Sequence, residues 1–185
     1  MPKQSVLPPI VISALLFCFY YFLSPWHDHL LMRYPRVIDG AWWQLITSQL
    51  MHHDAPHLWF NIAGVWIAWL LFPEQLKTSK DWWVVVPILL VSSIVELIGA
   101  PTYEVYAGFS GVLYGVFAYA ALQDTLEKHW IGGIVFVGLI IKIILDLDQP
   151  QHGDVVAVFA HIGGALAGIA AVFITRKLSK TSPKI

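Results

Sequence analysis

Long apolar runs alternate with short polar stretches along this chain. The runs lie near residues 7–23, 57–72, 82–99, 111–122, 131–145 and 156–175. Roughly 20 apolar residues in a helix span the hydrocarbon core of a bilayer, and the second, fourth and fifth runs are shorter than that. We therefore predict an all-α membrane protein whose six transmembrane helices form a single domain over residues 1–185.

The composition supports a membrane location. Hydrophobic residues make up 57% of the chain and charged residues only 12%, and the mean hydropathy of +0.65 lies well beyond that of a soluble domain. The net charge of −1, without a basic stripe, implies no nucleic-acid partner. Cys18 is the only cysteine, which excludes an intramolecular disulfide and disfavours a structural zinc site. We expect no metal and no cofactor.

Lysine and arginine residues near the ends of the runs indicate the orientation. With a cytoplasmic N-terminus, the inner side would hold Lys3, Lys77, Lys80, Lys128, Arg176, Lys177, Lys180 and Lys184. The outer side would hold Arg33, Arg36 and Lys142. Because positive charge accumulates in cytoplasmic loops, both termini are predicted inside, and the acidic loop from Asp146 to Asp154 outside.

The first run has the basic start of a cleaved signal peptide. We favour a retained span, because Ser24-Pro25-Trp26 is a poor cleavage site and five further runs follow. The one long loop, residues 24–56, mixes apolar and aromatic residues with few charges. We predict that this first outer loop is partly membrane-inserted and forms short amphipathic helices in the interface.

Three polar residues lie within apolar runs. Ser110 sits between glycines in Gly108-Phe109-Ser110-Gly111, Asn61 lies in HLWFN and His161 in AHIGG. With a helical rise of about 1.5 Å per residue, all three lie about 18–22 Å from the cytoplasmic ends of their runs. That depth is roughly 10 Å below the outer boundary of a ~30 Å core. We therefore expect the three to share one site.

Each of these residues also has a structural interpretation. An intramembrane serine commonly bonds to a carbonyl one turn earlier, and an asparagine can hold two helices together. Buried histidine is costly, which favours a functional role for His161. Ala160, Gly164 and Gly168 recur every four residues, and this smooth stripe predicts close packing of the sixth run against the fourth. Such packing would bring His161 to Ser110.

The residues predict a serine nucleophile with a histidine base. Ser110 would attack a peptide carbonyl, and His161 would take its proton and return it to the leaving amine. The first amides of the helix that begins at Ser110, with Asn61 and His57 one turn apart, would donate to the oxyanion. No carboxylate looks well placed to assist the histidine, and Glu96 is interpreted as structural.

A second polar cluster precedes the second run. It consists of His52, His53, Asp54 and His57. We expect this cluster to line the entry of water from the outer face.

HLWFN, GFSGVLYG and AHIGGALAG resemble the three signatures of the rhomboid intramembrane serine proteases, over about residues 40–175. The resemblance implies a six-helix rhomboid-like bundle with Ser110 as nucleophile, His161 as general base, and Asn61 and His57 as oxyanion partners. It also implies that Gly111 closes the serine motif and that Tyr114 stacks beside His161. For Tyr114 and His57, core packing and a solvated helix end are the structural alternatives. In this family, membrane-protein substrates enter past the fifth span.

The compact length and the segment WWQLITSQLMHHDAPHLWFNIAG look most like the rhombosortases, bacterial members of that family. This resemblance implies single-span or C-terminally anchored substrates with a Gly-Gly tail, a bacterial inner membrane and a site open to the periplasm. One departure matters. Many rhomboids have Trp-Arg in the first outer loop, whereas this chain has Trp43-Gln44, so arginine bracing of that loop is in doubt.

Two other classes of function stay open. A catalytically silent relative would bind membrane clients without cleaving them, but would be expected to lack Ser110 or His161. A small ion carrier lined by histidines would need ligands near the midplane and usually paired repeats, whereas the histidine cluster lies at one end. The HExxH motif of zinc proteases is absent.

Overall fold

The computed structural model describes residues 4–100, 105–147 and 157–181 of the chain. Regular structure in these ranges is helical, with one isolated bridge between Met32 and Tyr106. The long helices are α1 (Leu7–Phe22), α5 (Ala55–Leu71), α6 (Val85–Gly99), α7 (Ser110–Leu126), α8 (Trp130–Leu147) and α9 (Val158–Thr181). The short ones are η1 (Ser24–Trp26), α2 (His27–Leu30), α3 (Tyr34–Ile38), α4 (Gln44–Leu50) and η2 (Asp81–Val84).

Three helical segments of the described chain are long and apolar enough to cross a membrane, namely Asp81–Gly99, Trp130–Leu147 and Val158–Leu178. A fourth results if Leu7–Phe22 and Ser24–Leu30, which bend by 70°, are taken as one span. Helices α5 and α7 have 17 residues each. The protein is therefore a multi-pass integral membrane protein. Of the lysines counted for orientation, Lys3 and Lys184 lie outside the described residues.

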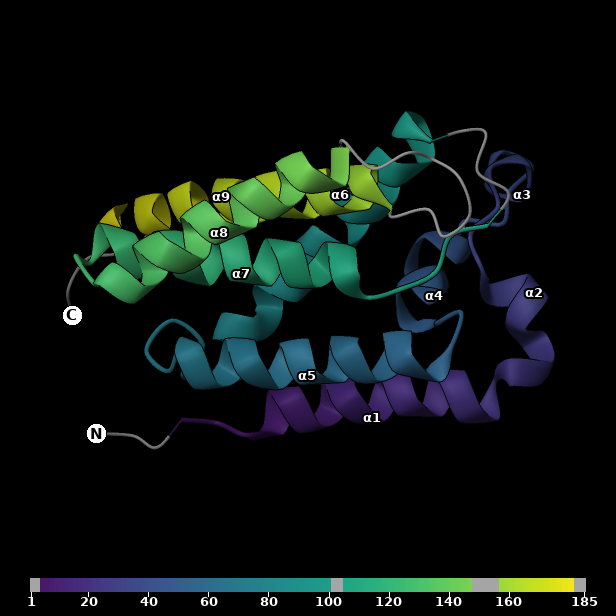
Figure 1. Ribbon diagram of the computed structural model, residues 1–185, viewed down its shortest axis with the longest axis horizontal. Helices are drawn as coiled ribbons and strands as arrows, with labels where there is room; N and C mark the ends of the chain where they lie inside the picture. The colour runs from purple at the N-terminus through teal and green to yellow at the C-terminus, as the bar shows by residue number, and fades with distance from the viewer. Residues whose placement is uncertain (1–3, 101–104, 148–156, 182–185) are drawn as a thin grey trace.

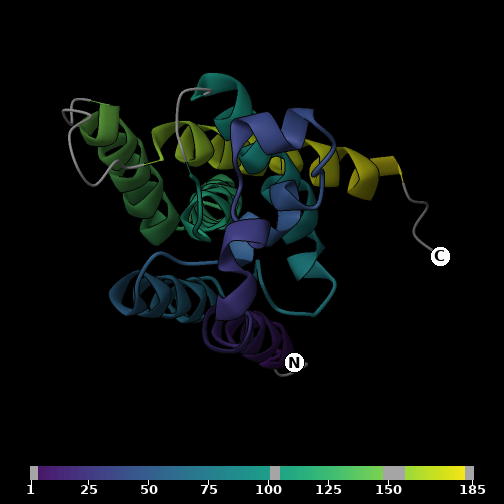
Figure 2. The same cartoon turned by 90° about the vertical axis from the view of Figure 1, so that its right-hand side faces the viewer.

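Helix α7 lies at the centre of the bundle. Its most extensive contacts are with α9, followed by α8, while α1 packs beside α5 on the other side of the molecule (Figure 1). In a view along the long axis, α1 and α7 appear nearly end on and α9 runs across them (Figure 2). The short helices α2 to α4 gather at the end where α5, α7 and α9 begin (Figure 1). The loop between the first two long helices therefore covers the end that holds Ser110.

The close packing of α7 against α9 depends on glycine. A Cβ atom at Gly164 would overlap the carbonyl oxygen of Gly111, and one at Gly168 would overlap the carbonyl oxygen of Gly115. Because both obstacles are backbone atoms, no side-chain rotation relieves them. The predicted contact through the small-residue stripe is confirmed, and it allows His161 on α9 to reach Ser110 on α7.

The loop between α1 and α5 is braced by Gln44, the residue that stands where the resemblance would place an arginine. The Gln44 side chain is buried; its Oε1 accepts a hydrogen bond from the backbone of Arg33 at 3.1 Å, and its Nε2 donates to the carbonyl of His29 at 3.1 Å. Trp43 Nε1 donates to the same His29 carbonyl. A glutamine therefore ties this loop together through backbone contacts.

Candidate active site

Ser110 and His161 lie in direct contact. His161 Nε2 is 2.9 Å from Ser110 Oγ, although the residues are 51 positions apart in sequence. Ser110 is the first residue of α7, and His161 belongs to the first turn of α9. The imidazole is almost fully buried, whereas the serine is half-buried and so stays accessible to a reactant.

Helix α6 fixes the backbone next to His161. Glu96 Oε2 accepts a hydrogen bond from the amide of Ala160 at 2.7 Å, and Ser92 Oγ donates to the carbonyl of Ala160 at 3.0 Å. Ser92 and Glu96 are one helical turn apart, so one face of α6 clamps both polar groups of Ala160. Glu96 has the structural role predicted for it, because it satisfies an amide in the first turn of α9.

The ring of Tyr114 stacks on the ring of His161. Their centroids are 4.0 Å apart and their planes differ by 3°, which is the geometry that the resemblance implied. The Tyr114 hydroxyl donates to Asp146 Oδ2 at 3.0 Å. The tyrosine therefore restricts the tilt of the imidazole and at the same time binds the carboxylate beside it.

Asp146 was expected in an outward acidic loop, and this expectation was wrong. It lies in the last turn of α8, its side chain is 1% exposed, and its Oδ2 is 3.2 Å from His161 Nδ1. The apolar run ends at residue 145, but the helix continues far enough to turn Asp146 inward. The rest of that loop, residues 148–154, lies outside the described residues.

The sequence held one signal for this placement. Lys142 and Asp146 are four residues apart, the spacing at which helical side chains meet, and the structure pairs Lys142 Nζ with Asp146 Oδ1. Such a pair predicts that the helix continues past Asp146. The notion that no carboxylate is well placed near the histidine is therefore also corrected.

His57 and Asn61 lie on α5, which packs on α7 from the side opposite α9 (Figure 1). Asp54 caps this helix by accepting from the amide of His57 at 2.7 Å, and Asn61 Nδ2 donates to the carbonyl of His57 at 3.1 Å. The His57 ring packs against Gly108, where a Cβ atom would meet ring atom Nε2 at 2.8 Å. Gly108 also has a φ of +135°, which side chains disfavour. Glycine at this position therefore lets His57 approach the start of α7.

The segment before α7 is anchored by residues that the sequence did not single out. The Tyr106 hydroxyl shares its one proton between two acceptors, Gln49 Oε1 at 3.1 Å and the carbonyl oxygen of Gly108 at 3.0 Å. Gln49 Nε2 donates in turn to Ser93 Oγ on α6 at 2.9 Å. The two contacts of Gln49 are long-range; they join α4, α6 and the segment before Ser110, and they have no local sequence pattern.

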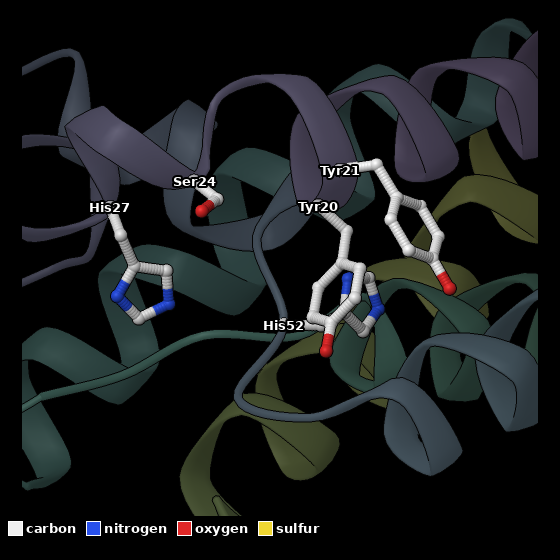
Figure 3. A pocket seen from close by; sticks show the side chains of 5 residues that line it. All are labelled: Tyr20, Tyr21, Ser24, His27 and His52. Atoms are coloured by element: carbon white, nitrogen blue, oxygen red, sulfur yellow. The ribbon is translucent and has the colours of Figure 1, made fainter.

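A pocket of about 250 Å³ adjoins the α5 side of the site. Its lining consists of Tyr20, Tyr21, Ser24, His27 and His52 (Figure 3). The fully buried His52 ring lies 5.0 Å from the His57 ring, edge to face. Burial lowers the pKa of His52 to about 3, so this imidazole is neutral at ordinary pH. Within the described ranges, no group of three or more His, Cys, Asp or Glu side chains is arranged to hold a metal ion.

Comparison with known proteins identifies the family. The model of the rhomboid domain matches residues 39–178. The chain is 28% identical to the rhomboid protease GlpG of Haemophilus influenzae over 157 residues, which cover 82% of this chain and 80% of that protein. It is 22% identical to the putative rhomboid protease YdcA of Bacillus subtilis over 149 residues, 80% of this chain and 75% of that protein.

A mammalian protein is also similar. Rhomboid-related protein 4 of Mus musculus is 28% identical over 146 residues, 69% of this chain, and the chain spans 42% of that longer protein. The region that matches the domain model contains Ser110, His161 and the α7–α9 contact that joins them. The chain therefore belongs to the rhomboid family.

Proposed function

We propose that this rhomboid family member is an intramembrane serine endopeptidase that uses Ser110 and His161 as its catalytic pair. The observation that carries the proposal is the 2.9 Å contact between Ser110 Oγ and His161 Nε2 across two helices. A nucleophile and a base within hydrogen-bond reach are the geometric signature of such an enzyme. The relatives named as rhomboid proteases support the same activity.

The reaction has two halves. Ser110 Oγ attacks the carbonyl carbon of a peptide bond while its proton passes to His161 Nε2. The C–N bond then breaks, and the imidazolium gives its proton to the leaving amine, which leaves an ester on Ser110. In the second half, water gives a proton to His161 as its oxygen attacks the ester carbon. The bond to the serine oxygen breaks, and the proton returns to Ser110.

The oxyanion of each tetrahedral intermediate would be held at the start of α7. The first amides of a helix have no carbonyl partner within the helix and lie at its positive end. Those of Ser110 and Gly111 would therefore donate to the oxyanion. The side chains of Asn61 and His57 would add donors from α5, and such donors have their full strength in a site that excludes bulk water.

The site would open to the outer side of a bacterial inner membrane. In this topology α1, α5, α6, α7, α8 and α9 are six spans of one domain, both termini are cytoplasmic, and the short helices α2 to α4 lie partly in the outer interface. Ser110 would then lie roughly 10 Å below the outer boundary of the core. The pocket that His52 helps to line would admit water toward His57 from that side.

The substrates would be single-span or C-terminally anchored membrane proteins that enter past α8. Of these, we favour proteins with a Gly-Gly pair before an apolar tail. A recessed serine accepts an unwound segment, and glycine both destabilises a helix and lets the backbone approach closely. Cleavage there would release or re-anchor the outer domain of the substrate.

A labelling experiment tests the catalytic pair. The purified protein in detergent is treated with a serine-directed fluorophosphonate, and cleavage of a single-span model substrate is measured in parallel. We expect one labelled site, loss of label and cleavage in Ser110→Ala, and a wild-type melting temperature in that variant. Cleavage that persists in Ser110→Ala would overturn the mechanism. A wild type that binds the substrate but neither labels nor cleaves would favour the silent client-binding function.

A second experiment tests the substrate preference. Cells that lack this protein are compared with complemented cells for the processing of a secreted protein with a Gly-Gly tail. We expect processing only in the complemented cells, and loss of processing when the substrate pair is changed to Leu-Leu, because bulk and helix both return. Normal Gly-Gly processing in the deletion strain, with an uncut generic single-span substrate, would refute this preference and leave the peptidase activity intact.

A further inference from the structure

Asp146 contributes the third side chain of a chain of contacts that begins at Ser110. Ser110 Oγ meets His161 Nε2, and His161 Nδ1 meets Asp146 Oδ2 at 3.2 Å. The three residues come from α7, α9 and α8. Because the side chains of both Asp146 and His161 are buried, water screens their contact less than it screens a pair at the surface.

The chemistry of a carboxylate fixes the direction of these bonds. An ionised carboxylate only accepts hydrogen bonds, so His161 Nδ1 must donate to Asp146. The proton of a neutral imidazole is then on Nδ1, and Nε2 has the free lone pair that accepts the proton of Ser110. The opposite tautomer would direct an N–H group at the serine and could not act as a base.

Resting on the proposed function, we propose that Asp146 is a positioning residue that holds His161 in its base-competent tautomer and stabilises the imidazolium formed during each proton transfer. Ser110, His161 and Asp146 then form a serine–histidine–aspartate arrangement assembled from three helices. A base oriented in this way by a third group is a recurrent feature of activated serine nucleophiles.

The partners of Asp146 divide between its two oxygens. Oδ1 pairs with Lys142, whose side chain is 55% exposed, while Oδ2 receives both His161 and the Tyr114 hydroxyl. A carboxylate that served only to pair with Lys142 would need no burial, because both groups remain solvated at a helix surface. Here the carboxylate of Asp146 turns inward. Tyr114 donates to this carboxylate and stacks on the ring of His161, so it holds the two groups together. This arrangement directs the negative charge at the imidazole.

The position of α8 offers a rival explanation. This helix packs extensively on α7 but only lightly on α9, so Asp146 also links α8 to α9, and the rival role is that of an anchor alone. An anchor and a positioning residue differ in what their loss changes. Loss of an anchor loosens α8, whereas loss of the carboxylate charge changes the protonation of His161 with the helix in place.

Asp146→Asn separates these roles, because it preserves size and removes charge. Its amide oxygen is expected to face Lys142 and its NH₂ group to face His161 Nδ1, which favours the unproductive tautomer. We expect kcat on the model substrate to fall by roughly 10²- to 10⁴-fold with KM nearly unchanged. Asp146→Glu retains the charge and should recover part of kcat. Val135→Ala, which loosens α8 where it packs on the core, should leave kcat near wild type.

The tautomer itself can be measured without activity. ¹⁵N NMR of histidine-labelled Ser110→Ala protein, with the His161 signals assigned by subtraction of a Ser110→Ala/His161→Gln spectrum, reports which ring nitrogen carries the proton. We expect Nδ1–H when Asp146 is present and Nε2–H when Asp146→Asn is added. Asp146→Asn with wild-type kcat, or the same tautomer in both proteins, would overturn the positioning role.

The two proposals fail differently. If Ser110→Ala still cleaves, the proposed catalytic pair is wrong, whatever the tautomer of His161. If Ser110→Ala is inactive while Asp146→Asn keeps wild-type kcat, the catalytic pair stands and the role of Asp146 is refuted. If Val135→Ala and Asp146→Asn have equal melting temperatures and lower kcat to the same extent, Asp146 serves only as an anchor of α8.

Discussion

The two sides of Ser110 are built differently. On the base side, the bonds of His161 cross helices, because its ring contacts Ser110 and Tyr114 on α7 and Asp146 on α8. On the oxyanion side, the hydrogen bonds of His57 and Asn61 stay within α5 and its cap. The proposed base is therefore oriented by tertiary structure in the free protein, whereas the proposed donors of α5 are held by their own helix.

This difference follows from what each side must bind. In the proposed mechanism the proton acceptor, His161, exists in the free protein, and its tautomer and direction have to be correct at the start of the reaction. The oxyanion exists only after attack, so its donors have no common partner in the free protein and commonly converge later. Asn61 Nδ2 carries two protons and donates one to the carbonyl of His57. The second N–H is therefore available to donate to an oxyanion.

The largest effect is expected on the base side. His161→Ala should lower kcat by more than about 10³-fold, because nucleophile and base act as a unit. For the same reason, the Ser110→Ala/His161→Ala double variant should be no worse than either single variant. Turnover of the model substrate and melting temperatures of all three variants are the measurements. Additive losses in the double variant would contradict a shared step.

One feature of the base side was accessible from sequence: the stripe at Gly164 predicts which helix carries the histidine to the serine. The common depth of Ser110 and His161 in the bilayer, which follows from helix rise and charge positions, stays a prediction. Asp146 was missed because hydropathy ends the run at residue 145, while the helix continues for one further inward-facing side chain. At a helix end, an error of one residue in the predicted boundary is enough to place the charge of Asp146 in a loop when it is in fact buried.

Other contacts had no local signal at all. The bond from Tyr106 to Gln49 joins residues 57 positions apart, and Gln44 braces backbone groups that only the folded loop brings together. Such pairs depend on tertiary geometry, whereas patterns along the chain report on periodicity and burial. The oxyanion roles of Asn61 and His57 stay predictions for a different reason, because the oxyanion forms only during the reaction and is absent from the free protein.

The second prediction breaks the interface that builds the base side. Gly164→Leu places side-chain atoms against the carbonyl of Gly111, so α7 and α9 must separate. Overpacking typically costs about 1–3 kcal/mol of stability, but a displacement of about 1 Å can lower activity by 10²-fold or more. Ala170→Leu, at an exposed position of the same helix, is the matched control. Full activity with a lowered melting temperature in Gly164→Leu would limit the stripe to packing.

The third prediction concerns the oxyanion side. Asn61→Ala should lower kcat by about 10²-fold with little change in KM, because its donor acts mainly on the transition state. Asn61→Asp, which retains size but replaces the NH₂ group by an acceptor, should be at least as impaired. Turnover measured at saturating substrate provides the test. An unchanged kcat in Asn61→Ala would reduce this residue to helix packing and make the oxyanion side depend on the amides of α7.

The smallest effect is on stability, at the pocket beside the oxyanion side. Burial of the ring lowers the pKa of His52 from 6.5 to about 3. On acidification, the unfolded chain therefore binds a proton at this histidine before the folded protein does. This contribution to stability is fully present above pH 6.5 and is lost progressively as the pH falls toward 3. His52→Gln should therefore lose less melting temperature between pH 7.5 and pH 5 than wild type, by a few degrees. His29→Gln, at an exposed position, is the control and should change with pH as wild type does. If the melting temperatures of His52→Gln and wild type fall in parallel as the pH is lowered, the buried ring does not resist protonation.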